Sequence, residues 1–180
     1  MKKFQTFIIF SLMVFYIAIF YFSLHPNVSA GYRSYYITKD SNLTLKERKA
    51  LKPIALQDEI SYTDTKVGYD GWHAAESKYR WSAGQSSKIV FLLPAIINKL
   101  ETRILSFWID PLGDQRVSVF INGQRVFFGN VADKGRIDMS FPSFLLADGE
   151  NVIRIECLDA HATETDKRRR GVALSSFILR

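Results

Sequence analysis

Two separate stretches of the chain hold residue types that could bind a ligand. The first extends from Trp72 to Gly84 and includes Trp72, Glu76, Arg80 and Trp81. Tryptophan rings stack on sugar rings, and charged side chains hydrogen-bond sugar hydroxyls, so these four residues are candidates for binding a glycan. The same residues also suit a structural role, in which both tryptophans close one end of a core and Glu76 pairs with Arg80. Both interpretations stay open from the sequence.

The second stretch extends from Asp159 to Gly171 and is the longest loop between well-predicted strands. It contains Asp166 and Arg168, the latter within a run of four basic residues at 167–170. Long loops at the ends of sandwiches often hold the function, so Asp166 and Arg168 join the candidate glycan-binding residues. Such a basic run is also typical of a solvated surface that attracts phosphate without specificity.

The sequence offers few catalytic or metal-binding patterns. Its histidines, His25, His73 and His161, are far apart, and none has a partner at a metal-binding spacing. A Gly-x-Ser-x-Gly motif and a glycine-rich phosphate loop are both missing. Carboxylate pairs such as Glu164 with Asp166 arise in any chain with 18 acidic residues, so they do not indicate a glycosidase. We therefore predict a protein that is not an enzyme and uses no metal or other cofactor.

Short strands are the elements expected to position these residues. Asn122 and Gly123 lie between two alternating runs, which predicts a two-residue hairpin with a type I′ turn. In the simplest register Val119 pairs with Val126, and Val117 pairs with Phe128. About eight strands are expected, at residues 60–63, 88–93, 104–109, 117–121, 124–128, 137–141, 152–158 and 172–179.

These strands predict an all-β fold, a jelly-roll-like β-sandwich, because each apolar face must be covered by a second layer. Residues 89–93 are apolar on both faces, which predicts a central strand. Thr44 and Glu47 fit a capping box, so a short helix should follow and end before Pro53. Cys157 lies on the apolar face of its strand, which indicates a buried, unreactive thiol.

The beginning of the chain predicts a membrane anchor. No charged residue occurs from Phe4 to Leu24, a run long enough at 1.5 Å per residue to span the ~30 Å hydrocarbon core. Lys2 and Lys3 precede it, which predicts a cytoplasmic N-terminus and export of everything that follows. Small residues at 28–30 also fit signal peptidase cleavage after Ala30, although the run exceeds the ~7 to 15 residues of a typical signal peptide. We therefore expect an uncleaved, single-pass anchor in the inner (cytoplasmic) membrane, with a cleaved, secreted protein as the alternative.

The predicted organisation has three parts. An anchor at 1–24 is followed by a membrane-proximal stalk at 25–58, which contains the short helix, and by the β-sandwich at 59–180. The formal net charge of +6 is only mildly basic, and no nucleic-acid-binding motif accompanies it. Nucleic acid is therefore not an expected partner.

The two candidate stretches also carry a resemblance to a bacterial domain. The residues concerned are Trp72, Glu76, Arg80-Trp81-Ser82, Gly84, Leu93-Pro94, Asp166, Arg168, Gly171 and Ala173-Leu174. This pattern resembles the galactose-binding-like, carbohydrate-module-type jelly roll at the extracytoplasmic end of bacterial membrane glycosyltransferases and phosphoglycerol-transferase-like proteins. The family's closing motif reads Asp-x-Arg-x-Leu-Gly-x-Ala-Leu, and here Arg170 replaces the usual apolar residue. The resemblance covers about residues 60–180.

The resemblance implies a sandwich associated with envelope polysaccharide chemistry. We therefore expect a membrane-anchored, non-catalytic domain that recognises a glycan or glycolipid, or assists an enzyme that acts on one. The alternative is a structural scaffold that docks onto a multispanning membrane glycosyltransferase and binds no sugar itself.

Overall fold

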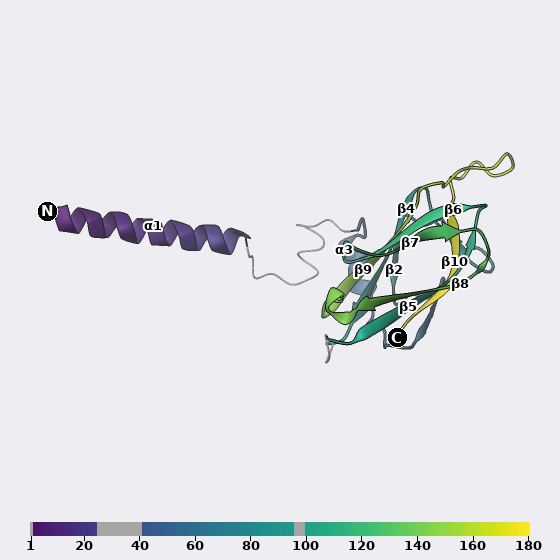
Figure 1. Cartoon of the computed structure of the whole chain (residues 1–180), viewed down its shortest axis with the longest axis horizontal. Coiled ribbons are helices and arrows are strands. Elements are labelled where there is room, and N and C mark those ends of the chain that lie inside the picture. Colours follow the sequence, from purple (N-terminus) through teal and green to yellow (C-terminus); the bar gives the residue numbers. More distant parts are fainter. Residues whose placement is uncertain (1, 25–40, 96–99) are drawn as a thin grey trace.

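The computed structural model describes residues 2–24, 41–95 and 100–180, and the last two ranges build an antiparallel β-sandwich (Figure 1). Ten strands form two sheets of five strands each. The strands are β1 (Glu59–Ser61), β2 (Gly68–Asp70), β3 (Arg80–Trp81), β4 (Ser86–Leu93), β5 (Thr102–Pro111), β6 (Gln115–Ile121), β7 (Gln124–Val131), β8 (Gly135–Pro142), β9 (Gly149–Cys157) and β10 (Val172–Leu179).

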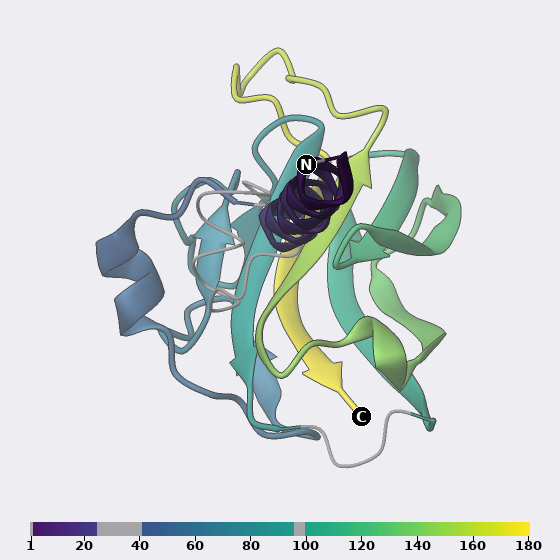
Figure 2. The ribbon, with the colours of Figure 1, turned by 90° about the vertical axis from the view of Figure 1, so that its left-hand side faces the viewer.

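The first sheet has the order β2-β4-β9-β6-β7, and the second has the order β1-β10-β5-β8 with β3 paired to β10. From β4 onward the chain crosses between the sheets at each step except at the β6–β7 hairpin, a connectivity typical of jelly rolls. In Figure 2, β10 (yellow) passes behind β9 (yellow-green), so the two layers are seen one behind the other. The predicted β-sandwich is confirmed, and β2 and β3 are additional short strands that the sequence did not indicate.

The core lies between the two sheets. Phe91, Phe107 and Phe177 are fully buried there, and Phe177 packs against the other two rings with centroid separations of 6.3 and 6.1 Å. Burying a side chain of this size contributes about 1.5 to 3 kcal/mol to the free energy of unfolding. Cys157 joins this core with 1% of its surface exposed, as its position in the sequence predicted.

The buried thiol of Cys157 should be chemically inert in the folded protein. Burial raises its pKa to about 11, because a thiolate would be poorly solvated in the apolar core. We expect iodoacetamide at pH 7 to leave Cys157 unmodified in the native protein and to alkylate it in denaturant, as measured by mass spectrometry. Labelling at equal rates in both conditions would contradict this placement.

The β6–β7 hairpin has the predicted turn but a different register. Asn122 and Gly123 both have positive φ, 47° and 87°, as a type I′ turn requires. A β-bulge follows, so Val119 pairs with Phe127 rather than with Val126. The predicted register was therefore wrong, because the bulge inserts one residue into β7 and thereby turns Phe127 toward the core.

The segment before the sandwich packs on the outer face of the first sheet. Helix α3 (Leu45–Ala50) begins at Thr44, whose side chain and that of Glu47 form the predicted capping box. Leu43 and Leu51 are buried against β4 and β9. Both faces of β4 are consequently covered, which explains why residues 89–93 are apolar throughout.

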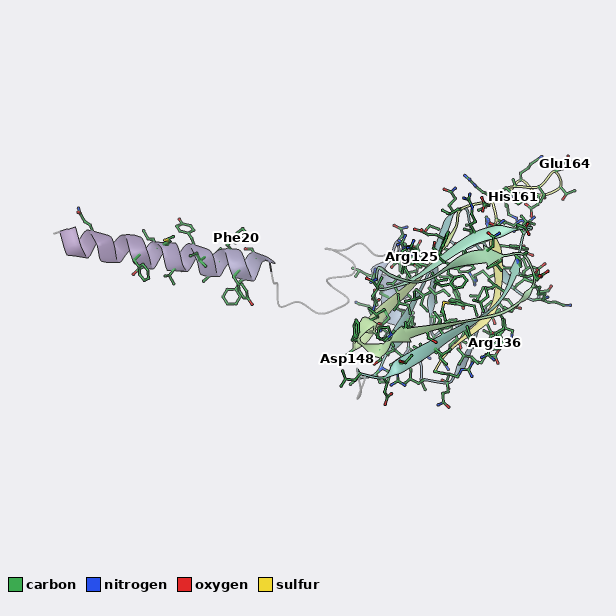
Figure 3. The ribbon with its side chains drawn as sticks, viewed as in Figure 1. Phe20, Arg125, Arg136, Asp148, His161 and Glu164 are labelled. Carbon is green, nitrogen blue, oxygen red and sulfur yellow. The ribbon has the colours of Figure 1, made fainter. Side chains whose placement is uncertain are left out.

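Helix α1 (Lys2–Leu24) is the one long helix in the described part of the chain. Its side chains at 10–23 are mostly exposed, with Phe20 as an example (Figure 3). Among the described residues, no helix combines the length and the apolar composition needed to cross a membrane. Residues 25–40 of the predicted stalk lie outside the described residues.

Candidate functional site

The two candidate stretches, far apart in the sequence, meet at one end of the sandwich. Strand β3, within the first stretch, pairs with β10, which follows the second stretch directly. The second stretch is a loop whose two ends are joined by a β-bridge between His161 and Arg170, and it projects beyond the strands in Figures 1 and 2. We call the surface formed by residues 72–84 and 159–171 the rim.

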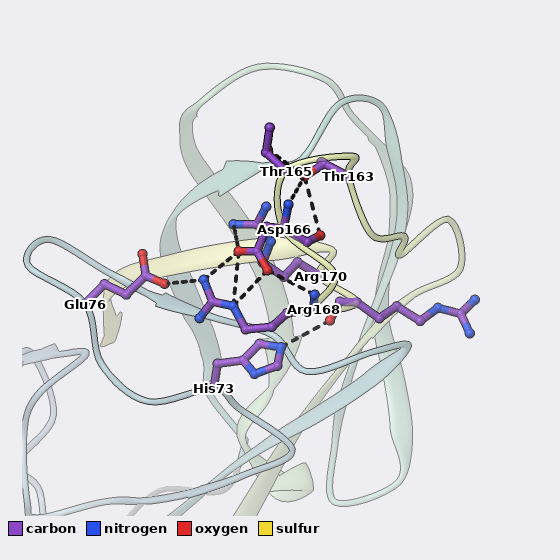
Figure 4. A network of polar contacts seen from close by, with 8 residues as sticks. His73, Glu76, Thr163, Thr165, Asp166, Arg168 and Arg170 are labelled. Atoms are coloured by element: carbon purple, nitrogen blue, oxygen red, sulfur yellow. Dashed lines mark hydrogen bonds and ion pairs between the residues drawn. The ribbon is translucent and has the colours of Figure 1, made fainter.

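A network of four charged side chains lies on the rim (Figure 4). Arg168 Nη2 is 2.9 Å from Glu76 Oε1 and 2.7 Å from Asp166 Oδ2, and Arg170 Nη1 is 3.2 Å from the same Asp166 oxygen. The hydrogen bonds from Arg168 hold the pKa of Asp166 well below its usual range, and they raise the pKa of Arg168. The structure therefore brings together three of the six candidate residues: the carboxylates of Glu76 and Asp166 both accept hydrogen bonds from the Arg168 guanidinium.

The loop holds Asp166 in place through its own backbone. Asp166 Oδ1 accepts from the backbone N–H of Arg168 at 3.0 Å, and Thr163 Oγ1 accepts from the backbone N–H of Asp166 at 3.0 Å. A nitrogen of the His73 ring lies 3.2 Å from the carbonyl oxygen of Arg169, which links this loop to the first stretch. These contacts preorganise the carboxylate on the rim before any ligand arrives.

Arg80 points away from the charged network. Its guanidinium lies over the Tyr69 ring, 4.3 Å from the centroid, and its Nε donates to the carbonyl of Tyr62 at 3.2 Å. Burial raises the pKa of Tyr69, so this ring stays neutral beneath the cation. The Glu76–Arg80 pair considered in the structural interpretation is not formed, because Glu76 pairs with Arg168.

The two tryptophans lie on the core side of the rim. Trp81 is 7% exposed, with Tyr79 packed edge-on at 5.5 Å and the Arg170 guanidinium over its ring, 4.8 Å from the centroid. Trp72 is half-buried, and its Nε1 donates to the carbonyl of Lys88 at 2.9 Å. Neither ring therefore exposes a full face to solvent on which a sugar could stack.

Arg170 is the rim residue that the sequence reasoning left out of the site. Its guanidinium covers the Trp81 ring and pairs with Asp166, at the position where the sequence departs from the motif it resembles. The departure from the motif was therefore the signal that could have identified it. Within the described residues, Trp81 Nε1 and Arg170 Nε are buried donors without an acceptor. An unpaired buried donor costs about 1 to 3 kcal/mol, so two of them in one cluster require an explanation.

The C-terminal end of the loop, at Gly171, is held against the residue that follows β3 and against the core. Ser82 Oγ accepts hydrogen bonds from the backbone N–H groups of Gly171 and Val172, both at 3.0 Å. A Cβ added at Gly171 would lie 2.4 Å from the Cβ of Cys157, so the close approach leaves room only for glycine. This explains the Ser82 and Gly171 positions of the motif by packing rather than by ligand contact.

The N-terminal end of the loop is held by an ion pair between Arg116 and Asp159, in which Arg116 Nη2 and Asp159 Oδ1 are 2.6 Å apart. Hydrogen bonds from the Arg116 side chain and backbone lower the pKa of Asp159 to about 2. Within the described residues, no group of three histidine, cysteine or acidic side chains is arranged to hold a metal ion.

The pair gives a pH prediction. Because the folded pKa of Asp159 lies below its unfolded value, the stabilisation is complete above about pH 4 and is lost as the pH falls through about 2. NMR titration of the carboxyl carbon should give a midpoint near 2, and Arg116→Gln should return it toward about 3.9. An unchanged midpoint in that variant would show that Arg116 is not the cause.

No family model matches the chain, and no curated protein matches it either. A native family 35 carbohydrate-binding module from Clostridium thermocellum aligns at 12% identity with a TM-score of 0.45, over 68% of this chain and 97% of that one. A family 35 module from Paenibacillus barcinonensis aligns at 16% identity with a TM-score of 0.44, over 68% and 98% of the two chains. A family 36 module in complex with calcium and xylotriose gives 14% identity and a TM-score of 0.41, over 68% and 98%.

Proposed function

We propose that this protein is a membrane-anchored, non-catalytic β-sandwich that recognises a glycan or glycolipid outside the cytoplasm and so assists envelope polysaccharide biosynthesis or modification. The rim is the binding surface. The observation that carries this proposal is the pair of buried, unpaired donors, Trp81 Nε1 and Arg170 Nε, beside a partly exposed network of carboxylates and guanidinium groups.

A sugar supplies what this cluster lacks. Once Arg170 moves aside and uncovers Trp81, a hydroxyl can accept from Trp81 Nε1 and can also donate to the carboxylates of Glu76 and Asp166. Arg168, shared by both carboxylates, can donate to the same ligand. When Arg170 moves off the Trp81 ring, the exposed aromatic face can stack on a pyranose ring. Glycan binding thus accounts for both the orphan donors and the charged network.

The same network argues against glycoside hydrolysis. A glycosidase needs one carboxylic acid that stays protonated near neutral pH, and this requires a raised pKa. The Arg168 guanidinium instead lowers the pKa of Asp166, which stays ionised at neutral pH. Asp166 therefore suits a hydrogen-bond acceptor for a hydroxyl and not a general acid.

The proposal predicts glycan binding by the full chain that depends on Arg168. Arg168→Gln should weaken binding to the preferred member of an envelope-glycan panel by about tenfold or more, since a hydrogen bond to a charged group contributes about 1.5 to 3 kcal/mol. Arg136→Gln is the matched control, because Arg136 pairs with Asp138 on β8 and has no part in the charged network of the rim. Calorimetry on protein in phosphatidylcholine nanodiscs would measure both. Equal affinities for the two variants would refute the assignment to the rim.

The uncharged run from Phe4 to Leu24 is proposed as the anchor, with the N-terminus in the cytoplasm and the sandwich on the periplasmic or extracellular side. Phe10, Phe20 and Phe22 are 65, 66 and 69% exposed, a large apolar surface that lipid would cover. The protein should remain in the membrane pellet after alkaline carbonate extraction, and deletion of residues 4–24 should release it. A mature N-terminus beginning after Ala30 would instead establish the cleaved, secreted form.

A scaffold that docks onto a membrane glycosyltransferase is the second candidate. It is favoured by the placement of Trp72 and Trp81 toward the core, which suits a structural role for the first stretch. This candidate predicts a stoichiometric membrane partner that co-purifies from mild detergent and is retained by the Arg168→Gln variant. Absence of any such partner would exclude it.

A further inference from the structure

An open depression of about 470 Å³ lies at the end of the sandwich opposite the rim, where β7 begins and β8 ends. In Figure 3, Arg125 and Asp148 mark this end, while His161 and Glu164 mark the loop of the rim. The volume falls within the ~300 to 1,000 Å³ of typical small-molecule sites. We call it the β7–β8 depression.

The walls of the depression combine one aromatic ring with polar groups. Phe144, 63% exposed, follows β8 and offers a ring to a ligand, while Phe141 is buried behind it. Gln124 and Ser140 are exposed, and their side chains make no hydrogen bond to any described residue. An aromatic ring beside free amide and hydroxyl groups is the composition expected for an amphipathic ring such as a sugar.

Among the described residues, Arg125 is the one charged residue that lines the depression. Its guanidinium lies over the Phe128 ring, 5.7 Å from the centroid, and forms no ion pair with a described residue. By contrast, Arg168 and Arg170 on the rim are both neutralised by Asp166. A lone, uncompensated guanidinium selects a ligand that carries a carboxylate or phosphate, which it can bind with two parallel hydrogen bonds.

The wall that carries Phe144 is rigidly attached to the sandwich. Asn122 Nδ2 donates to the carbonyl of Leu145 at 2.8 Å and to Asn151 Oδ1 at 2.8 Å. Asn151 is fully buried and bonds the backbone of Ala147 in both directions. Because these contacts fix the chain after β8, the depression is formed before a ligand binds, and little ordering entropy is lost on binding.

We propose that the β7–β8 depression binds one acidic saccharide unit, a uronate or a sugar phosphate. The anionic group pairs with Arg125, the ring packs on Phe144, and the hydroxyls bond to Gln124 and Ser140. This site is separate from the rim and made of different strands, so the inference does not depend on glycan binding at the rim.

Binding of glucuronate, glucose 6-phosphate, glucose and inorganic phosphate to the full chain in phosphatidylcholine nanodiscs tests this proposal. Calorimetry should give dissociation constants on the order of 1 mM for the two acidic sugars, as expected for ligands of this size. Glucose and inorganic phosphate should each bind at least fivefold more weakly, because glucose lacks the anionic group that pairs with Arg125 and phosphate lacks the ring that packs on Phe144.

Variants assign the binding to the depression. Arg125→Gln and Phe144→Ala should weaken glucuronate binding at least fivefold, with unchanged thermal unfolding because both side chains are exposed. Arg168→Gln on the rim, which does not line the depression, should bind glucuronate as the native protein does.

Three results would overturn the proposal. Inorganic phosphate that binds as tightly as glucose 6-phosphate would reduce the site to an anion contact. Glucuronate affinity that is lost in Arg168→Gln but kept in Arg125→Gln would move acidic-sugar binding to the rim. Arg125-dependent binding to phosphatidylglycerol vesicles, without binding of any soluble sugar, would identify the depression as a membrane-surface contact.

Discussion

Gly171→Ala is expected to lower the free energy of unfolding by about 3 kcal/mol, in the upper part of the range for an overpacked core. The new methyl group would lie 2.4 Å from the Cβ and 2.8 Å from the Sγ of Cys157, and 3.2 Å from Ser82 Oγ. Neither neighbour can retreat easily, because Cys157 is held in β9 and Ser82 accepts two backbone hydrogen bonds from the loop. Urea unfolding followed by circular dichroism would measure the change.

Gly135→Ala is the matched control for Gly171→Ala. Gly135 is the first residue of β8, as Gly171 is the residue just before β10, but a Cβ added at Gly135 meets nothing within 4 Å. Its replacement should change stability by less than about 0.5 kcal/mol or raise it slightly. The double variant Gly171→Ala with Cys157→Gly should lose less stability than the sum of the two single variants, because the nearest clashing atom is removed. Equal stability of the two alanine variants would show that the close approach at Gly171 is not as described.

Asn151→Ala is expected to lower the free energy of unfolding by about 3 kcal/mol, since each buried group left unpaired costs about 1 to 3 kcal/mol. The carboxamide accepts from the Ala147 N–H and from Asn122 Nδ2, both at 2.8 Å. It donates to the carbonyls of Ala147 and Gly149 at 2.8 and 3.0 Å. Alanine would leave these partner groups without a hydrogen bond in the protein interior, because Asn151 has no exposed surface.

Asn130→Ala provides the comparison for Asn151→Ala. Asn130 is an exposed residue of β7, so its replacement should alter stability by less than about 0.5 kcal/mol. If both asparagine variants unfold at the same urea concentration, the network around Asn151 does not hold the chain after β8. The proposed rigidity of the β7–β8 depression would then be lost as well.

The strands were predictable because their patterns are local. Alternation at 137–141 and the turn at Asn122 and Gly123 each need only a few neighbouring residues to specify backbone geometry. The bulge near Phe120 was not predictable, because Val126 and Phe127 suit the inner face equally well. The core decides between them, and only the folded structure contains that information. Strand β3 is similarly too short to show a pattern of its own.

The rim could be predicted only in part. The two stretches were identified by their residue types, but the contact between Glu76 and Arg168 spans 92 positions in the sequence. No local pattern indicates that Glu76 pairs with Arg168 rather than with Arg80. The motif drew attention to Arg170 only as a departure, and its place over Trp81 follows from tertiary packing. The β7–β8 depression had no signal in the sequence, because its residues are ordinary strand and turn residues.

Hydrogen exchange with and without a bound glycan tests the central claim most directly. The full chain in nanodiscs would be incubated with the preferred member of the envelope-glycan panel, and amide exchange would be followed by mass spectrometry. If the glycan binds at the rim, amide exchange at residues 72–84 and 159–171 should be slower with the glycan than without it, and exchange in the β6–β7 hairpin should not change. If a bound glycan left both rim segments unprotected, or if no envelope glycan bound at all, glycan recognition by the rim would be contradicted.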